Sequence, residues 1–516
     1  MPRLTPRGRH AAALLASLAL GAVLPMQAAT ATESARAAAA VDAGLKRIEH
    51  IVVIYAENRS FDNLYGLFPG ADGIARAPAT ARLQTDHDGR PLPRLPPVWN
   101  DSSGRFKQPI ANGPFRIDAA PFDLPLTART PDLVHRYYQS IEQINGGRMD
   151  RFAALSDAGG LTMAHYDGAP LPMWQYAREY VLADHFFMAA YGGSFLNHFW
   201  LVCACTPVYP GAPENLKAQL DASGRLKRRP GSPASALNGP PALHDGRITP
   251  DGYAVNTLQP PYQPSGVTPA AGGDPRLADP ARHALPPQQA RTIGDTLGAK
   301  GIRWAWYADG WQAALADGMQ PPEQPRSVIY GHAEGKPGLE AHHQPFNYFA
   351  RYAPGSAERA AHLKDGAEFL AAIDAGELPQ VVFYKPGNHV NEHPGYADVL
   401  SGDAHIARIV ARLQASPLWP GLAIIVTYDE NGGYWDHVAP PSGPGWGDRW
   451  GPGPRIPAIV VSPFAKRGYI DSTPYDTTSI IKFITRRFDL EPLPGVRPNA
   501  GDLTNAFDFK PKKKNK

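Results

Sequence analysis

The sequence predicts an α/β protein with a central, mostly parallel sheet flanked by helices. Three apolar runs, residues 51–56, 380–384 and 422–428, lack the alternation of half-exposed strands and have the composition of strands buried on both faces. A fourth run of this kind covers residues 456–462, and helical patterns lie between the runs. The first and third runs end abruptly in acidic residues, at the sheet edge where open parallel sheets bind their ligands.

The N-terminus has the three regions of a secretory signal peptide. Three arginines among the first nine residues precede an apolar run over residues 11–24, and the small residues 29–31 fit the cleavage rule of signal peptidase. The apolar run is too short for a convincing membrane anchor. We therefore expect residues 1–31 to be removed and the mature protein to be exported, soluble and periplasmic or secreted, with no stable membrane anchor.

The 516-residue chain could hold about three domains by length alone. We instead expect one large domain over residues 32–505, since large α/β enzymes often carry insertions. Residues 207–289, rich in Pro, Gly, Asp and Ala, predict a loop insertion that forms a lid or rim. Residues 506–516 form a basic tail. The net charge of +3 predicts no nucleic acid as a specific partner.

The two cysteines, Cys203 and Cys205, exclude a disulfide framework and a four-thiolate zinc site. A bridge with one residue between its cysteines is expected to be strained. The sequence therefore favours two small buried thiols, with an unusual disulfide as the alternative.

A helix is predicted to open at Thr130, with Pro131 in its first turn, and to end at the glycine pair in residues 145–147. His135 falls on the polar face of this helix, opposite the apolar stripe. An exposed position is the interpretation that the local sequence favours. The alternative is that this face meets a functional site.

Ser194 follows Gly192-Gly193 and precedes an apolar, helix-like run. This order resembles a tight turn into a helix N-terminus, where backbone N–H groups and the helix dipole favour phosphate. A simple N-cap serine is the alternative, and on local sequence it is the favoured one.

Glu57 and Asn58 follow the first buried strand, and Asp429 and Glu430 follow the third. Carboxylates that converge at one sheet edge repel one another unless a cation lies between them. The two clusters together therefore predict a divalent metal ion bound by oxygen atoms. The loop after the second strand holds three further possible ligands, His389, Glu392 and His393. A polar surface loop is an equally good interpretation of that segment.

Seven motifs, in this order, resemble the bacterial phosphoesterase family, which contains AcpA-type acid phosphatases and bacterial phospholipases C. They are Glu-Asn-Arg-Ser-Phe-Asp at 57–62, His135 with Asn-Gly-Gly at 145–147, Gly-Gly-Ser at 192–194, His-His-Gln-Pro-Phe at 342–346, Asn-Glu-His-Pro at 391–394, Tyr-Asp-Glu-Asn-Gly-Gly at 428–433 and Trp-Asp-His-Val-Ala-Pro-Pro at 435–441. The resemblance spans nearly all of the mature chain.

The resemblance implies an alkaline-phosphatase-like α/β fold and a role for each matching residue. It implies a divalent metal ion, of unstated identity, held by Glu57, Asn58, Ser194, Asp429 and Glu430. Ser194 would also be the nucleophile that forms a phosphoserine intermediate. The layer around the phosphate would consist of His135, His393 and His343, with His342 as the alternative to His343. Asp436 and His437 are expected to be structural.

Within the family, serine at position 194 and a chain that ends soon after its last core helix favour an acid phosphatase acting on small phosphomonoesters. Histidines near the phosphate hint at an acidic working pH. The alternative is a phospholipase C that hydrolyses phosphatidylcholine-type lipids. A different class is a secreted binding protein that has lost its chemistry.

Overall fold

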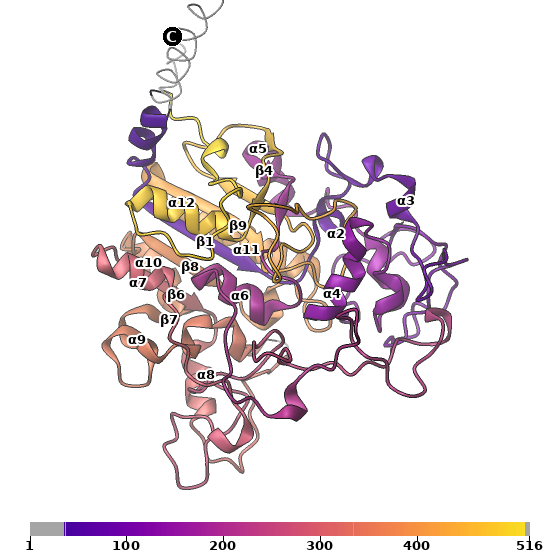
Figure 1. The fold of residues 1–516 in the computed structure, drawn as a ribbon. Coiled ribbons are helices and arrows are strands. Elements are labelled where there is room, and N and C mark those ends of the chain that lie inside the picture. Colours follow the sequence, from indigo (N-terminus) through magenta and orange to yellow (C-terminus); the bar gives the residue numbers. More distant parts are fainter. Residues whose placement is uncertain (1–35, 37, 334, 511–516) are drawn as a thin grey trace, which may run out of the picture. The chain divides into compact units, whose positions relative to one another are not determined.

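The computed structural model describes residues 36, 38–333 and 335–510. Residues Ile48–Lys510 form one compact unit, and the description below concerns this unit (Figure 1). Of the other described residues, 38–45 are helical. The predicted signal peptide and residues 511–516 of the basic tail lie outside the described residues.

An eight-stranded sheet forms the centre of the unit, in the order β11-β4-β10-β9-β1-β8-β6-β7. Its strands are β1 (His50–Ala56), β4 (Val181–Ala183), β6 (Trp304–Ala308), β7 (Leu363–Asp365), β8 (Val381–Lys385), β9 (Leu422–Tyr428), β10 (Ala458–Val461) and β11 (Tyr469–Asp471). β10 pairs antiparallel with both β9 and β4, and the other pairings are parallel. The predicted α/β class with a mostly parallel sheet is confirmed.

β1 lies between β9 and β8, and its register sets the geometry of the functional edge. Ala56 is opposite Tyr428 of β9, and Ile54 is opposite Tyr384 of β8. The three strands therefore end side by side. Their apolar side chains are almost fully buried because helices cover both faces of the sheet.

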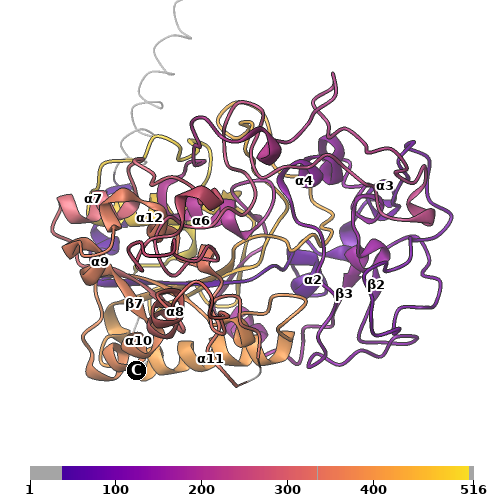
Figure 2. The same cartoon turned by 90° about the horizontal axis from the view of Figure 1, so that it is seen from below.

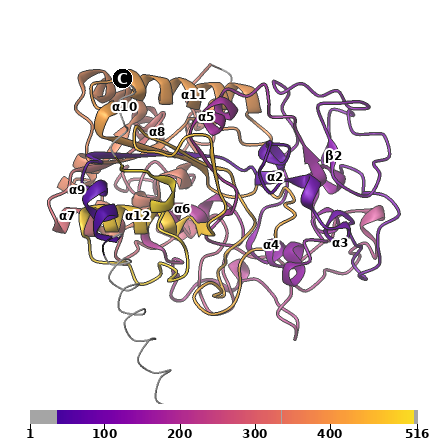
Figure 3. The ribbon, with the colours of Figure 1, turned by 90° about the horizontal axis from the view of Figure 1, so that it is seen from above.

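Two groups of helices enclose the sheet. α6 (Ser194–Cys203), α7 (Ile293–Ala299) and α12 (Thr478–Phe488) lie on one face. α5 (Pro172–Glu179), α10 (Gly366–Ala375) and α11 (Val399–Ala415) lie on the other (Figures 2 and 3). The helices predicted near residues 404–413 and 477–487 are thus confirmed as α11 and α12. Among the described residues, no helix combines the length and the apolar character that a bilayer crossing requires.

Shorter elements complete the unit. The remaining α-helices are α2 (Phe61–Tyr65), α3 (Ala79–Arg82), α4 (Tyr137–Ile144), α8 (Trp311–Gly318) and α9 (Ala357–His362). Two-residue strands pair as β2 (Phe115–Arg116) with β3 (Ala164–His165), and as β5 (Phe186–Phe187) with β12 (Tyr475–Asp476). Residues 207–289 hold only short 3-10 turns and isolated bridges.

The helix predicted from Thr130 begins seven residues later, at Tyr137, so this predicted boundary was wrong. The chain before it is extended, with φ −118° and ψ 155° at Arg136. Side chains distant in sequence bind its N–H groups: Val134 donates to Asp157 Oδ1 at 3.1 Å and Tyr137 to Asn256 Oδ1 at 3.1 Å. These bonds hold the segment open. The predicted helix end is correct, with Asn145 left-handed at φ 49°.

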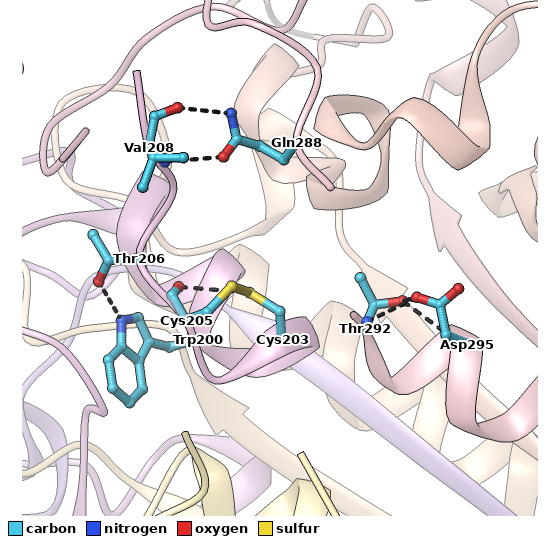
Figure 4. The surroundings of a disulfide bond; sticks show 8 residues. All are labelled: Trp200, Cys203, Cys205, Thr206, Val208, Gln288, Thr292 and Asp295. Atoms are coloured by element: carbon cyan, nitrogen blue, oxygen red, sulfur yellow. Dashed lines mark hydrogen bonds between the residues drawn. A yellow bond between two sulfur atoms is a disulfide. The ribbon is translucent and has the colours of Figure 1, made fainter. Parts of the chain in front are cut away.

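Cys203 and Cys205 form a disulfide at the end of α6 (Figure 4). The favoured prediction of two free thiols was therefore wrong. Ala204 ends the helix in the left-handed region, at φ 47°, and the two Cα atoms lie 5.1 Å apart. That separation is within the usual range for disulfides.

Candidate functional site

Glu57 and Asp429 are the first residues beyond the parallel strands β1 and β9, so the sheet brings them together. The Asn58 N–H donates to Asp429 Oδ1 at 3.0 Å, and the Asp429 N–H donates to the carbonyl of Ala56 at 3.1 Å. Glu57, Asn58, Asp429 and Glu430 are all fully buried. The two acidic clusters predicted to converge do so.

Ser194 is the first residue of α6, and its hydroxyl faces the β1 end. Its Oγ lies 3.1 Å from Glu57 Oε2 and 3.1 Å from Asn58 Oδ1. One hydroxyl proton cannot serve both acceptors at once. Oxygen atoms about 3 Å apart, however, are spaced like neighbouring ligands of an octahedral ion with metal–oxygen bonds near 2.1 Å. The three oxygens therefore fit a hard divalent cation.

Unpaired carboxylate oxygens give a second reason to place a cation here. Asp429 Oδ2 and Glu430 Oε1 are buried and have no hydrogen-bond partner in the described part of the chain. Burial, and then the charge of Asp429, raise the pKa of Glu57 and Glu430 well above the ordinary carboxyl value. A bound cation would give the unpaired oxygens a partner and would reduce the repulsion among the buried carboxylates. The donor set fits the predicted metal.

A cavity of about 290 Å³ opens above Ser194. His135, His342 and His393 line it together with Ser194, and His135 Nε2 lies 3.8 Å from Glu430 Oε1. His135 therefore faces the site, as in the alternative interpretation of the sequence, and not only solvent. Residues 255–257 also line the cavity, so the loop-rich segment 207–289 contributes to its rim.

His343 does not line this cavity. Its Nε2 lies 3.1 Å from Glu57 Oε1 without hydrogen-bond geometry, and the side chain is 1% exposed. The sequence placed His343 in the phosphate layer, but the structure puts His342 on the cavity wall and His343 beside the carboxylate. Both histidines belong to one 3-10 turn, Ala341–His343, so their side chains diverge.

Burial lowers the pKa of two of the cavity histidines, His342 and His393. Burial, and then the charge of Lys385, lower the pKa of His342 to about 3. Burial, and then His135, lower the pKa of His393 well below its usual value. These directions oppose the sequence-based hint that protonated imidazoles favour an acidic working pH.

Glycines allow the close packing at the serine. A Cβ on Gly193 would lie 2.8 Å from the carbonyl oxygen of His135, and Gly192 has a φ of +94°. Across the site, a Cβ on Gly432 would lie 2.1 Å from the carbonyl oxygen of Asn58. Side chains at these positions would push the histidine segment and the Asn58 turn away from Ser194.

Two residues at the site were not identified from the sequence. Lys385, the last residue of β8, contacts Glu57 Oε1 through Nζ and donates to the Tyr55 carbonyl at 3.0 Å. His198 lies one helical turn after Ser194, and its Nδ1 is 2.7 Å from the Ser194 carbonyl oxygen. The available signals were a lysine closing an otherwise apolar strand and the four-residue spacing from Ser194.

A second acidic cluster, which contains Asp436 and His437, packs around a buried arginine. The ligand-type atoms of Asp62, Asp436 and His437 lie within 4.8 Å of one another. Arg455, however, donates to Asp436 Oδ1 at 2.8 Å and to Asp62 Oδ1 at 3.2 Å. His437 Nδ1 lies 2.7 Å from Asp62 Oδ2. The guanidinium thus offsets part of the negative charge of the two carboxylates.

The other candidate ligands in the loop after β8 lie apart from the Ser194 site. Glu392 is buried, and its Oε2 accepts a hydrogen bond of 2.9 Å from the Tyr428 hydroxyl. His389 is exposed. Of the three loop candidates, only His393 lines the cavity.

Comparisons with known proteins agree with the resemblance. The chain is 25% identical over 510 residues to "Non-hemolytic phospholipase C" of Burkholderia pseudomallei, covering 90% of this chain but 59% of that protein. It is 25% identical over 521 residues to "Phospholipase C A" of Mycobacterium tuberculosis, covering 93% and 81%. A solved protein in the alkaline phosphatase superfamily from Vibrio parahaemolyticus aligns over 75% of each chain, with 10% identity and a TM-score of 0.30.

The sequence profile of one family extends across the whole region that carries the sheet and the site. The profile of the phosphoesterase family matches residues 48–491. This span includes both strand ends, the α6 serine and the cavity histidines. The protein therefore belongs to the phosphoesterase family.

Proposed function

We propose that this chain is an exported, metal-dependent hydrolase of phosphoric esters with Ser194 as its nucleophile. The observation that carries the proposal is the Ser194 hydroxyl, placed 3.1 Å from oxygens of both Glu57 and Asn58 at the floor of a cavity. Family membership supports the phosphoester substrate. The Cys203–Cys205 disulfide supports export to an oxidising compartment.

The residues suggest a two-step reaction. Glu57, Asn58, Asp429 and Glu430 would hold the cation, which when bound lowers the pKa of the serine hydroxyl and offsets phosphoryl charge. Ser194 Oγ would attack phosphorus and lose its proton toward Glu57 Oε2, which lies 3.1 Å away. The Oγ–P bond would form while the ester P–O bond breaks, and the leaving oxygen would take up a proton from water. Water would then cleave the phosphoserine, release phosphate and restore the hydroxyl.

The cavity walls suggest how the phosphate is held. His135, His342 and His393 stand around the opening above Ser194, where their ring nitrogens can contact phosphate oxygens. The Nδ1 atoms of His135 and His393 donate to the carbonyl oxygens of Leu133 and Pro394. The Nε2 atoms of these two rings therefore donate to phosphate only when the ring is protonated, whereas His342 Nε2 can donate from the neutral ring. The first turn of α6 has no side-chain cap in the described part of the chain, and it adds backbone N–H groups and the positive end of the helix dipole. In this proposal, His342 has the phosphate-binding role that the resemblance implied for His343.

Phosphomonoesters are the proposed substrates. The cavity of about 290 Å³ is slightly smaller than the range for ligand pockets, about 300–1,000 Å³, and suits a phosphate with a small leaving group. A serine nucleophile at position 194 is also the feature that makes this chain resemble the acid phosphatases of the family. The second candidate is a phospholipase C, because relatives that bear this name match at least 90% of the chain.

Hydrolysis of p-nitrophenyl phosphate, with and without a chelator, tests the proposed chemistry. Ser194→Ala should abolish turnover and leave the far-UV circular dichroism spectrum unchanged. Ser462→Ala is a matched control, because this buried serine follows β10 and bonds to Leu422, at the other end of β9. Turnover in Ser194→Ala at the rate of Ser462→Ala would remove Ser194 from the mechanism, and absence of turnover in the wild type would favour the binding-protein interpretation.

The choice between phosphatase and lipase needs a substrate comparison. The proposal predicts a higher kcat/KM for p-nitrophenyl phosphate than for phosphatidylcholine presented in mixed micelles. Faster release of phosphocholine from the lipid would assign the chain to phospholipase C activity instead.

A further inference from the structure

A second set of metal-ligand atoms lies directly behind the Ser194 site. Ligand atoms of Glu57, His198 and His343 lie within 4.8 Å of one another, and all three residues are buried. The two imidazole rings stack in parallel, with centroids 5.0 Å apart. The Nε2 atoms of both rings have no hydrogen-bond partner in the described part of the chain. Two imidazole nitrogens and a carboxylate form a donor set that binds Zn²⁺.

The positively charged side chain of Lys385 contacts this cluster. Lys385 is fully buried at the end of β8, and its Nζ contacts Glu57 Oε1, the oxygen that faces His343. The ammonium also donates to the Tyr55 carbonyl at 3.0 Å. Lys385 is thus anchored to the backbone of β1, the strand that carries Glu57, rather than held by the carboxylate alone.

The two oxygens of Glu57 therefore have different partners. Oε1 contacts Lys385, whereas Oε2 lies 3.1 Å from Ser194 Oγ. A divalent ion bound to Oε1 would lie beside the ammonium at the same oxygen, and like charges at such a distance repel strongly in a buried site. Lys385 and a second ion at this cluster are therefore mutually exclusive.

We infer that Lys385 is the resident cation of the Glu57–His198–His343 cluster: it prevents a second divalent ion from binding there and leaves Glu57 Oε2 for the ion at Ser194. The inference rests on the proposed metal at Ser194. It makes Lys385 a positioning residue that sets the number of metal ions per chain. It also implies a latent zinc site that appears when the ammonium is removed.

The number of metal ions bound per chain tests this inference. Metal-free protein is dialysed against Zn²⁺, and bound zinc is counted by mass spectrometry. The wild type should bind one ion, and Lys385→Met, which keeps the length but removes the charge, should bind two. The double variant Lys385→Met/His198→Ala should return to one. Lys364→Met, on β7 of the same sheet, is the charge-removal control and should bind one ion.

Two ions in the wild type, or one ion in Lys385→Met, would overturn the inference. If Lys385→Met does not fold, His198→Ala in the wild-type background decides. Its zinc count and affinity should be unchanged, because His198 binds no ion while Lys385 is present. A loss of about tenfold or more in zinc affinity, the size typical for a group that supports a metal, would contradict this. The activity of Ser194→Ala, with and without chelator, tests the proposed function separately. Zero zinc in the wild type would overturn this inference alone, because the proposed function does not depend on zinc as the metal.

Discussion

Asn58 combines an unusual backbone with a side chain aimed at the site. Its φ is +59°, a left-handed conformation that asparagine tolerates better than most residues. Its N–H binds Asp429 and its Oδ1 faces Ser194. Asn58 therefore has two roles, as a proposed metal ligand and as a left-handed turn residue. An alanine substitution would disturb both roles at once, so its effect could not be assigned to either.

Asn58→Gly separates these two roles. Glycine accepts the left-handed backbone without strain but removes the amide oxygen. We expect the urea midpoint of the metal-free protein to stay close to that of the wild type, while the affinity for Mn²⁺ falls at least about tenfold. Asn58→Asp keeps an oxygen and should retain binding. Wild-type Mn²⁺ affinity in Asn58→Gly would exclude Asn58 as a ligand.

The extended segment before α4 holds His135 at the cavity, and Asn256 fixes that segment. Asn256 accepts from the Tyr137 N–H at 3.1 Å and donates to the Gly246 carbonyl at 2.7 Å. One buried side chain thus ties the histidine segment to the loop-rich residues 207–289.

Asn256→Ala should loosen this connection. It leaves the buried Tyr137 N–H unpaired, which costs about 1–3 kcal/mol of stability, whereas the Gly246 carbonyl keeps its bond of 3.2 Å from Arg136. We expect a lower melting temperature and a lower kcat/KM for p-nitrophenyl phosphate, because His135 is no longer held in place. Asn499→Ala, which removes a bond from Asn499 to the Pro444 carbonyl in an exposed loop, is the matched control. Equal kinetics in both variants would contradict a positioning role for Asn256.

Among the secondary-structure elements, strands were easier to predict than the start of a helix. β1 and β9 followed from uninterrupted apolar runs, and the position of Ser194 at a helix N-terminus followed from its two glycines. The start of α4 could not be predicted, because Asp157 and Asn256, distant in sequence, bind its N–H groups. The same holds for His342 and His343, since tertiary packing decides which adjacent side chain faces the cavity.

For the molecule as a whole, the buried carboxylates make stability depend on the metal. Glu57, Asp429 and Glu430 meet at one sheet edge with two unpaired oxygens among them. An ion that binds only the folded state adds stability as RT ln(1 + [L]/Kd), about 2.7 kcal/mol at one hundred times Kd. We therefore expect a chelator to lower the melting temperature.

Asp429→Asn is the control for this effect. It should melt at the same temperature with or without chelator, because the metal-binding carboxylate is gone while the amide oxygen can still accept from the Asn58 N–H. If the wild type melted identically in both conditions, no stabilising metal would be bound to the folded chain.

The central claim is that the ends of β1 and β9 and the start of α6 share one divalent ion. Anomalous scattering from crystals grown with Mn²⁺ tests it most directly. The account predicts one strong peak bounded by Glu57 Oε2, Asn58 Oδ1, Ser194 Oγ and Asp429 Oδ2. A peak at Asp62, Asp436 and His437 instead, with none beside Ser194, would contradict it.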